Sequence, residues 1–458
     1  MHDLAGLTPD RWKDACGEAS ALLQEILRLD TTNPPGNERL VANALAASLA
    51  RDGVQCEILE AAPGRANLVC RLSSGREEPA LLLTGHADVV SPGDLSRWTH
   101  PPFAGVLADG MIWGRGAVDM KNMVAMSTMV VKLLARQGVT LKRDVVLAIV
   151  ADEEEGCDCG ARFLVERHAD KVRAGYALGE IGGFPTPAGT ARIIPVQTAE
   201  KGMCWLRLRA EGPTGHGSMP RPDNAVLRLC DAVARLGEKP LPQHNTPVVQ
   251  NFIEQVAALQ KLPGRLVMPQ MLNPRLSNVI LSRLLPDKEQ GRIFGALLHN
   301  TVSPTVLRAG EKANMIPGEA EATLDGRILP GQTAEDLLHE IREVVGSGFR
   351  LEVIRTSPPV INHPPDSSLW DCIRQTIARH AGGLPAVPAM IPGFTDAQYF
   401  SRLGIRWYGF SPLWLEASSG LRFADLFHGY DERIPEDGYH WGLRALFETV
   451  HAFCAGAA

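Results

Sequence analysis

The sequence predicts an α/β fold, with a mixed, mostly parallel sheet covered by helices on both faces and an inserted α+β domain. Two near-continuous apolar runs, residues 80–84 and 144–150, are typical of parallel strands that are buried on both faces. Helical periodicity between these runs supplies a covering layer. After residue 202 the pattern changes, because residues 203–211 and 320–327 alternate apolar and polar side chains as half-exposed strands do.

The other elements follow from spacing and from helix-breaking residues, in chain order. Apolar residues at helical spacing predict a first helix from Thr8, and Pro34 and Pro35 end that helical stretch. A second helix leads into two strands before the first buried run. Residues 243–306, inside the insert, are apolar and irregular. The expected helices cover residues 8–29, 39–51, 120–137, 224–236, 333–345, 367–380 and 438–455, and the expected strands cover residues 55–60, 67–72, 80–84, 144–150, 203–211 and 320–327.

Composition and charge exclude several classes of protein. The chain of 458 residues carries 46 Lys and Arg against 52 Asp and Glu, a net charge of -6, which argues against a nucleic-acid binder. No apolar run approaches the roughly 20 residues of a membrane span, and the first residues do not resemble a secretory signal. Nine cysteines, an odd number, fit free thiols in a reducing compartment. We therefore expect a cytoplasmic globular protein.

Polar side chains follow both buried strands, where the sites of open α/β sheets form. Gly85-His86-Ala87-Asp88 ends the first strand, and Asp152-Glu153-Glu154-Glu155 follows the second. Either motif alone also fits a solvated strand end. Four adjacent acids repel one another, however, unless cations such as divalent metals are present. Because adjacent residues of an extended segment point to opposite sides, one carboxylate could bind metal while its neighbour faces the reacting water.

Other motifs, or their absence, argue against several alternative chemistries. Gly114-Arg115-Gly116 is not a dinucleotide loop, because Asp119 takes the place of the third glycine. The sequence holds no G-x-S-x-G elbow and no phosphate-binding P-loop. Cys157-Asp158-Cys159 lacks a second cysteine pair nearby and fits a pair of structural thiols. Glu180, at a strand end, and His428 are further candidate ligands, although each alone is more often structural.

Together, these segments resemble the di-zinc metallohydrolase family of aminoacylase, acetylornithine deacetylase, succinyl-diaminopimelate desuccinylase and glutamate carboxypeptidase. The resemblance runs through nearly the whole chain and includes the motifs at residues 30–36, 85–88, 98–103, 114–121, 152–154, 215–218, 314–317, 395–397 and 428–432. Residues 300–305 and 325–333 are most similar to the carboxypeptidase S and N-acyl-amino-acid hydrolase branch. The small residues that usually follow the acids are replaced here by Glu155-Gly156-Cys157-Asp158-Cys159, which suggests that one of these thiols confers sensitivity to oxidation.

The resemblance implies a role for each matching residue. It makes His86 and Glu180 ligands of one zinc ion, Glu154 and His428 ligands of a second, and Asp119 the bridge between them. Cobalt or manganese could substitute for zinc. Asp88 would orient His86 and Glu153 would be the general base. It also implies a catalytic domain of residues 1–198 and 358–458 and an inserted, ferredoxin-like lid and dimerisation domain of residues 199–357.

The resemblance further implies hydrolysis of an amide bond, N-acyl or peptide, next to a free carboxylate. His216, on the insert, would donate to the oxyanion in the partner's site of a homodimer, and Arg327 and Asn314 are candidates for holding the substrate carboxylate. The alternatives are a dipeptidase, which would use the same machinery, and a non-catalytic binding protein that keeps the fold. Apolar residues of the insert around Val248 and the aromatic residues near Trp407 fit either an apolar acyl pocket or plain core.

Overall fold

The structure is a computed structural model that describes residues 6–285, 288–416, 418 and 420–455, and it divides into two compact units. The first unit consists of the chain up to Thr198, Pro364–Pro388 and the chain from Thr395. The second consists of Ala199–His363 and Ala389–Phe394. The second unit thus takes in residues 358–363 and 389–394, which the sequence analysis assigned to the catalytic domain. The reason is local pairing, since Val360 pairs with Glu200 and the Lys201 amide donates to the Ile391 carbonyl at 3.3 Å.

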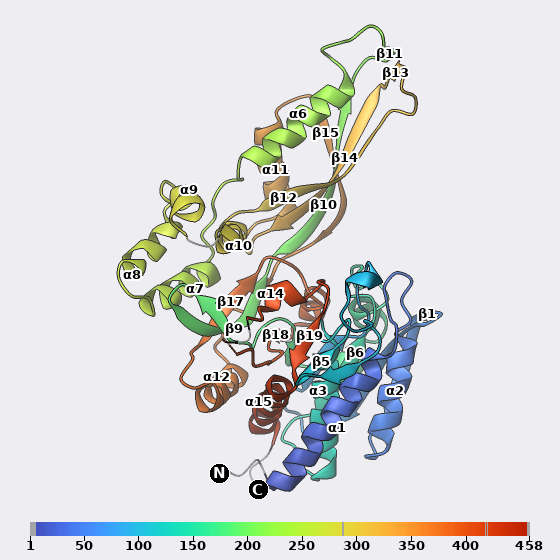
Figure 1. Ribbon diagram of the computed structural model, residues 1–458, viewed down its shortest axis with the longest axis vertical. Helices are drawn as coiled ribbons and strands as arrows, with labels where there is room; N and C mark the ends of the chain where they lie inside the picture. The colour runs from blue at the N-terminus through green and yellow to red at the C-terminus, as the bar shows by residue number, and fades with distance from the viewer. Residues whose placement is uncertain (1–5, 286–287, 417, 419, 456–458) are drawn as a thin grey trace. The chain divides into compact units, whose positions relative to one another are not determined.

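The first unit contains most of a ten-stranded mixed sheet (Figure 1), which has the order β1-β2-β6-β3-β7-β18-β9-β16, with β8 and β17 also paired to β9. Strands β6, β3, β7 and β18 are mutually parallel, whereas the pairings of β1 with β2, β2 with β6 and β18 with β9 are antiparallel. The strands are β1 (Cys56–Ala62), β2 (Arg65–Leu72), β3 (Leu81–His86), β6 (Val145–Val150), β7 (Tyr176–Gly179), β8 (Thr186–Ala188), β9 (Ala191–Glu200), β16 (Val360–Ile361), β17 (Ala386–Ile391) and β18 (Arg406–Gly409). A separate small sheet contains β4 (Val106–Ala108), β5 (Met111–Trp113) and β19 (Arg433–Pro435).

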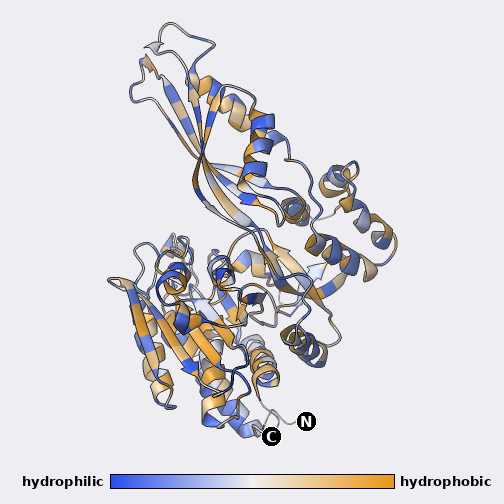
Figure 2. Cartoon of the chain, turned by 180° about the vertical axis from the view of Figure 1, so that it is seen from behind, coloured by the Kyte–Doolittle hydropathy of each residue, from blue (hydrophilic) through white to orange (hydrophobic). Residues whose placement is uncertain are grey.

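Helices cover this sheet and contribute most of its core. The longer ones are α1 (Pro9–Leu27), α2 (Arg39–Ala50), α3 (Lys121–Arg136), α12 (Ser368–His380) and α15 (Glu436–Cys454). Figure 2 shows apolar residues concentrated on the central strands, as burial between layers of helices requires. The shorter helices are η1 (Leu95–Arg97), α4 (Ala161–Arg167), α5 (Ala169–Val172), α13 (Ala397–Phe400), η4 (Ser401–Leu403) and α14 (Phe423–Leu426). The predicted α/β class is confirmed.

Local sequence explains where the helices begin. Thr8 caps α1 by accepting a hydrogen bond from the Arg11 amide, and Pro9 occupies the first helical turn, where its missing N–H costs nothing. Ser367 caps α12 in the same way through the Trp370 amide. Among the described residues, no helix combines the length and the hydropathy that a membrane span needs.

The second unit is built on an antiparallel sheet in the order β12-β14-β10-β15. Helices α6 and α11 pack on one face, where they share a core with alternate residues of β10 and β14 such as Leu206 and Leu324. The elements are β10 (Gly202–Glu211), β11 (Gly215–His216), α6 (Ala225–Glu238), α7 (Pro247–Ala258), α8 (Gly264–Val267), η2 (Met268–Leu272), α9 (Ser277–Val279), η3 (Ile280–Leu284), α10 (Lys288–Leu298), β12 (Thr301–Ala309), β13 (Met315–Ile316), β14 (Glu319–Ile328), α11 (Ala334–Val345) and β15 (Phe349–Ser357).

The middle of the insert is helical, so the prediction of an irregular segment over residues 243–306 was wrong. Thr246 caps α7 through the Val249 amide, and Pro247 follows at the first helical position. Val249, Ile253 and Val256 then form the buried face of α7. The helices that follow are mostly three to five residues long, which is too short for a periodic pattern to reveal them.

Candidate metal centre

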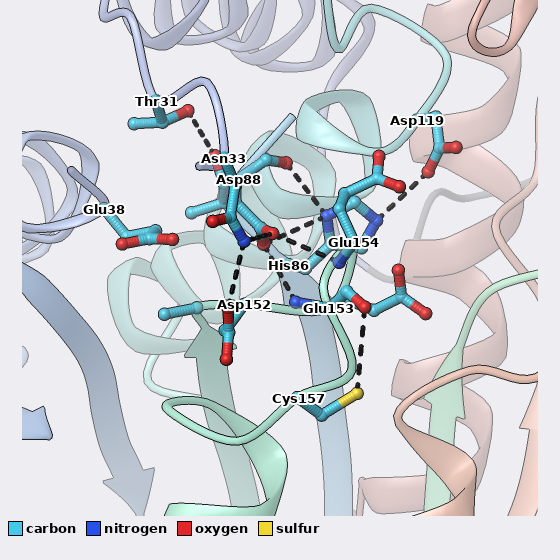
Figure 3. A network of polar contacts seen from close by, with 12 residues as sticks. Thr31, Asn33, Glu38, His86, Asp88, Asp119, Asp152, Glu153, Glu154 and Cys157 are labelled. Carbon is cyan, nitrogen blue, oxygen red and sulfur yellow. Dashed lines mark hydrogen bonds and ion pairs between the residues drawn. The ribbon is translucent and has the colours of Figure 1, made fainter. Parts of the chain in front are cut away.

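Three neighbouring parallel strands of the first unit end at one edge of the sheet and carry the candidate ligands there. In the order β6-β3-β7, His86 is the last residue of β3, Glu154 follows β6 and Glu180 follows β7. Figure 3 shows the side chains of this edge converging on His86 and Glu154. Because His86 ends its strand and Glu154 and Glu180 lie within four residues of the end of theirs, the sheet brings all three to the same edge.

The first group of potential ligands is His86, Asp119 and Glu180. The His86 Nε2 atom lies 3.0 Å from Asp119 Oδ1 and 3.7 Å from Glu180 Oε2. The imidazole is fully buried. Its other nitrogen, Nδ1, donates to the backbone carbonyl of Asp88 at 3.0 Å, which leaves Nε2 as the atom free to bind a metal.

The second group is Asp119, Glu154 and His428. The His428 Nε2 atom lies 3.2 Å from Asp119 Oδ2 and 3.1 Å from Glu154 Oε2. Asp119 therefore presents one carboxylate oxygen to each group. In both groups the potential ligand atoms lie within 4.8 Å of one another, which is the arrangement expected for two ions that share a bridging carboxylate.

Asp88 ties the first strand end to the acidic loop after the second. Its Oδ1 atom lies 3.5 Å from His86 Nδ1 and accepts the Glu153 amide at 3.2 Å, and its Oδ2 atom accepts the Glu154 amide at 3.1 Å. The carboxylate is completely buried. Asp88 thus holds the imidazole and the backbone of both acids in one network.

The sequence analysis missed the residues that hold Asp119 in place. Glu432 is completely buried, and its carboxylate accepts the amides of Gly116, Val118 and Asp119 at 2.9, 2.7 and 3.1 Å. Arg115 neutralises it through an ion pair of 2.6 Å. The adjacent motifs at residues 114–121 and 428–432 were noted in the sequence, but nothing there shows that Glu432 accepts hydrogen bonds from the first motif.

A second missed network supports the acidic loop from the opposite side. Asn33 donates to Asp88 at 2.9 Å and to Asp152 at 3.0 Å, and Arg65 forms ion pairs of 2.8 Å with both Glu38 and Asp152. Asp152 has a φ of 68°, in the left-handed region that few residues other than glycine adopt. The motif of residues 30–36 therefore positions the loop that carries Glu153 and Glu154.

Glu153 lies beside both groups but belongs to neither. Its side chain is buried, and burial, followed by the charge of Glu180, raises the pKa of its carboxyl well above the usual value. Asp396 is also buried nearby, and burial raises its pKa to about 7. A carboxyl group with a raised pKa, close to a potential metal centre, is suited to accept and return a proton.

The two cysteines after the acids do not contribute ligands. Neither Cys157 nor Cys159 belongs to a potential metal-binding group among the described residues. Cys157 is fully buried, and burial raises the pKa of its thiol. Gln398 donates to its sulfur at 3.8 Å, so the thiol is part of the packing around Glu153.

The donor set fits a pair of divalent cations. All donors are imidazole nitrogens or carboxylate oxygens, the ligand types that zinc and related ions take. The Glu154 Oε1 atom is buried without a hydrogen-bond partner in the described structure, although an acceptor in such a place needs one. Hydrogen bonds to Asp119 and Glu154 raise the pKa of His428 to about 10, and burial raises the pKa of Glu154 to about 7. Binding of a cation by these groups would compete with their protons.

The remaining predicted site residues belong to the second unit. His216 and Asn314 lie close together, since β11 pairs with β13 and the Gly217 amide donates to the Asn314 carbonyl at 2.8 Å. Both side chains are exposed. Arg327 lies near the other end of β14, where it is paired with Asp325 at 2.8 Å and its guanidinium stands over the Phe394 ring at 4.9 Å. The structure therefore does not bring Asn314 and Arg327 of one chain together.

Three of the residues that hinted at an acyl pocket are core residues. Val248 is completely buried in α7, and Trp407 and Tyr408 are buried in β18. The Tyr408 hydroxyl pairs with Ser367 at 2.7 Å, and the Trp407 indole donates to the Glu180 carbonyl at 3.1 Å. For these three residues, burial favours the core interpretation over an acyl pocket.

Comparison with known proteins relates the whole arrangement to one family. The model of peptidase family M20/M25/M40 matches residues 82–452. A probable carboxypeptidase S-like 2 from Dictyostelium discoideum is 31% identical over 78% of this chain and 69% of its own length. The human N-fatty-acyl-amino acid synthase/hydrolase PM20D1 is 28% identical over 81% of this chain and 73% of its own length. Human aminoacylase-1 is 28% identical over 91% and 90% of the two chains.

Solved structures share the fold at lower identity. The M20 family metallo-carboxypeptidase Sso-CP2 from Sulfolobus solfataricus superimposes with a TM-score of 0.68 at 19% identity, covering 95% of this chain and 99% of its own. Human carnosine dipeptidase 1 superimposes with a TM-score of 0.66 at 15% identity, covering 97% and 98% of the two chains.

Proposed function

The chain belongs to peptidase family M20/M25/M40, and from this premise we propose that it hydrolyses an amide bond next to a free carboxylate, using two zinc ions. The observation that carries the proposal is the position of Asp119, which offers one carboxylate oxygen to His86 and the other to His428. A carboxylate between two sets of nitrogen and oxygen donors suits a two-metal hydrolase. The metal ligands in the proposal are His86, Asp119, Glu154, Glu180 and His428.

Zinc is the proposed metal because the donors are imidazoles and carboxylates in compact groups, and cobalt or manganese could substitute. When bound, such ions would polarise the scissile carbonyl and make water a stronger nucleophile at neutral pH. The protein supplies the remaining functions. Asp88 holds His86 in place and Glu432 holds the backbone of Asp119.

Glu153 is the proposed general base. Its neighbour Glu154 lies against His428, while Glu153 lies outside both groups with a raised pKa. A carboxyl of this kind can take a proton from the attacking water and return it to the leaving amine, a role worth roughly 10²–10⁴-fold in rate.

The substrate is proposed to be an N-acyl amino acid or a short peptide. The relatives include a carboxypeptidase S-like protein, an N-fatty-acyl-amino acid hydrolase and an aminoacylase. Arg327 is the proposed ligand of the substrate carboxylate, because its Nη1 atom is buried without a hydrogen-bond partner among the described residues. A dipeptidase is the second candidate function, and carnosine dipeptidase 1 shares the fold.

A substrate screen tests this proposal directly. The zinc-loaded protein is incubated with N-acyl amino acids of increasing chain length, with matched dipeptides, and with N-acyl amines that lack the carboxylate. Release of free amine from the first set and none from the last is the expected result. Equal hydrolysis of substrates with and without the carboxylate would contradict the proposed recognition.

We further propose a homodimer in which His216 and Asn314 complete the site of the partner chain. Glu319 and Arg327 are eight residue steps apart along β14, which corresponds to roughly 27 Å of strand. His216 lies beyond the Glu319 end, as Figure 1 shows for β11 and β13, so it cannot reach a small substrate held by Arg327 of the same chain. The described outer edge of β12 has no strand partner and exposes Val306 and Leu307, which would suit a dimer interface.

Complementation between two inactive variants tests the shared site. His216→Ala and Glu153→Ala chains should each be nearly inactive alone. A heterodimer isolated through two different tags would contain one site with both residues intact, and its activity should approach half that of the wild-type dimer. A verified heterodimer without recovered activity would show that His216 does not act across subunits.

The proposed location is the cytoplasm. All nine cysteines are free thiols, including the fully buried Cys204 and the exposed Cys230. A reducing compartment keeps such thiols free.

A further inference from the structure

The second unit contains a cavity of about 920 Å³ that is lined only by its own residues. Its walls are α10, the segment of α9 and η3, the beginning of β12 and the end of α6. None of the lining residues is one of the proposed ligands, Glu153, His216, Asn314 or Arg327. The proposed function leaves this cavity unexplained.

One face of α10 forms a long wall of the cavity. The residues that it contributes are spaced three and four apart and so lie on one side of the helix. Those within the helix span eight steps, from Lys288 to Ala296, which corresponds to roughly 12 Å. Cationic side chains stand near one end of this face and glycine and alanine toward the other, and a histidine lines the cavity just after the helix ends: Lys288, Gly291, Arg292, Gly295, Ala296 and His299.

The cavity is electropositive, although the protein as a whole carries a net charge of -6. Lys288 and Arg292 face it from α10, and Lys239 faces it from the segment after α6. Among the residues that the structure describes, no aspartate or glutamate lines it. Within the described parts of the chain, none of these three cations forms an ion pair or a side-chain hydrogen bond, so their charges are available to a ligand.

The rest of the lining is suited to an apolar chain. Leu236, Leu241 and Leu281 contribute to it, and Leu236 and Leu241 are buried in the core of the unit. Gly291 lets α10 approach η3, because an added Cβ there would lie 2.5 Å from the Leu281 carbonyl oxygen. Gly295 differs, since an added Cβ would meet no atom within 4 Å and would point into open space.

We propose that this cavity binds a single-chain anionic amphiphile, an apolar chain that ends in a carboxylate. Lys288 and Arg292 would hold the carboxylate one helical turn apart, and the chain would lie along the small residues of α10 against the three leucines. The site is additional to the metal centre, and its ligand need not be cleaved.

Calorimetric titration of the zinc-loaded protein with sodium dodecanoate, below its micelle-forming concentration, tests the proposal. We expect one dodecanoate per chain in this site, with at least tenfold weaker binding of 1-dodecanol, which lacks the charge, and of acetate, which lacks the chain. Equal binding of dodecanol or of acetate would overturn the assignment of the ligand class.

Two variants locate the binding site, each with a matched control. Gly295→Phe fills the cavity without a clash at Cβ and improves helix propensity, so the chain should fold and lose this binding. Gly17→Phe, at an exposed glycine of α1 with equally open surroundings, should keep it.

The double variant Lys288→Gln/Arg292→Gln should weaken dodecanoate binding at least tenfold. Arg265→Gln/Arg283→Gln removes the same charge from exposed residues outside the cavity and should not. Dodecanoate binding that survives both cavity variants would overturn the proposal. If Gly295→Phe fails to fold, the charge variants still decide.

Discussion

Replacement of Glu153 by glutamine separates proton transfer from metal binding. The amide keeps the shape of the carboxylate but cannot accept a proton. Glu153 belongs to neither group of potential ligands, so both groups stay complete in Glu153→Gln. Its backbone amide, which donates to Asp88 at 3.2 Å, is unchanged, so the positions of the neighbouring ligands should be kept as well.

The expected loss in turnover is at least about 10²-fold, or roughly 2.7 kcal/mol in the activation barrier. The assay is steady-state release of amine from the best N-acyl amino acid, with metal content measured on the same sample. Burial raises the pKa of Glu153, so replacing this carboxyl should also change the pH dependence of turnover rather than scale it uniformly.

Glu154→Gln is the matched control, because it alters the adjacent residue by the same change. Glu154 Oε2 lies 3.1 Å from His428 Nε2 within the second group, so this variant should lose metal affinity. If Glu153→Gln lost metal while Glu154→Gln kept it, the roles of the two acids would be reversed and the reasoning refuted.

Two further predictions concern stability. Gly160→Ala should lower the free energy of unfolding by about 3 kcal/mol in urea titrations, because an added Cβ would lie 1.7 Å from the Ala151 carbonyl oxygen; unchanged stability would contradict this packing. Although burial opposes it, hydrogen bonds from His380 and Arg444 lower the pKa of Glu448 to about 2. A depressed pKa stabilises the folded state above the unfolded value of about 4.5, and this contribution is lost as the pH falls toward 2. Glu448→Gln should therefore cost about 1–2 kcal/mol at pH 7, allowing for partial solvent exposure, and the difference from wild type should shrink below pH 4.5. A difference that stayed constant down to pH 3 would contradict this origin.

The elements that sequence predicts well are those with a strong local pattern. The buried runs form β3 and β6, and the helix predicted over residues 120–137 is α3. These elements could be predicted because continuous apolar runs and helical periodicity can be recognised from the residue types alone. The short helices of the insert show no such pattern in the sequence. They are three to five residues long and bury two residues each at most, so they form no repeated apolar face that a sequence pattern could show.

The grouping of candidate ligands at the sheet edge could also be predicted from the sequence. His86 and Glu154 follow adjacent parallel strands, and such strand ends must meet. The supporting network could not be predicted in this way. Glu432 contacts Val118 across 314 positions of the chain, and only the folded structure brings them together. Asn314 and Arg327 show what the sequence leaves open, since one chain places them near opposite ends of β14 and their proposed joint role then needs the partner chain.

Metal stoichiometry measured together with activity tests the central claim most directly. Protein loaded with zinc and freed of excess metal should contain two ions per chain by elemental analysis. Removal of both by a chelator should abolish amide hydrolysis, and zinc, cobalt or manganese should restore it. Asp119→Asn should reduce binding of both ions, because this residue contacts both groups. Full hydrolytic activity in a sample without bound transition metal would contradict the account.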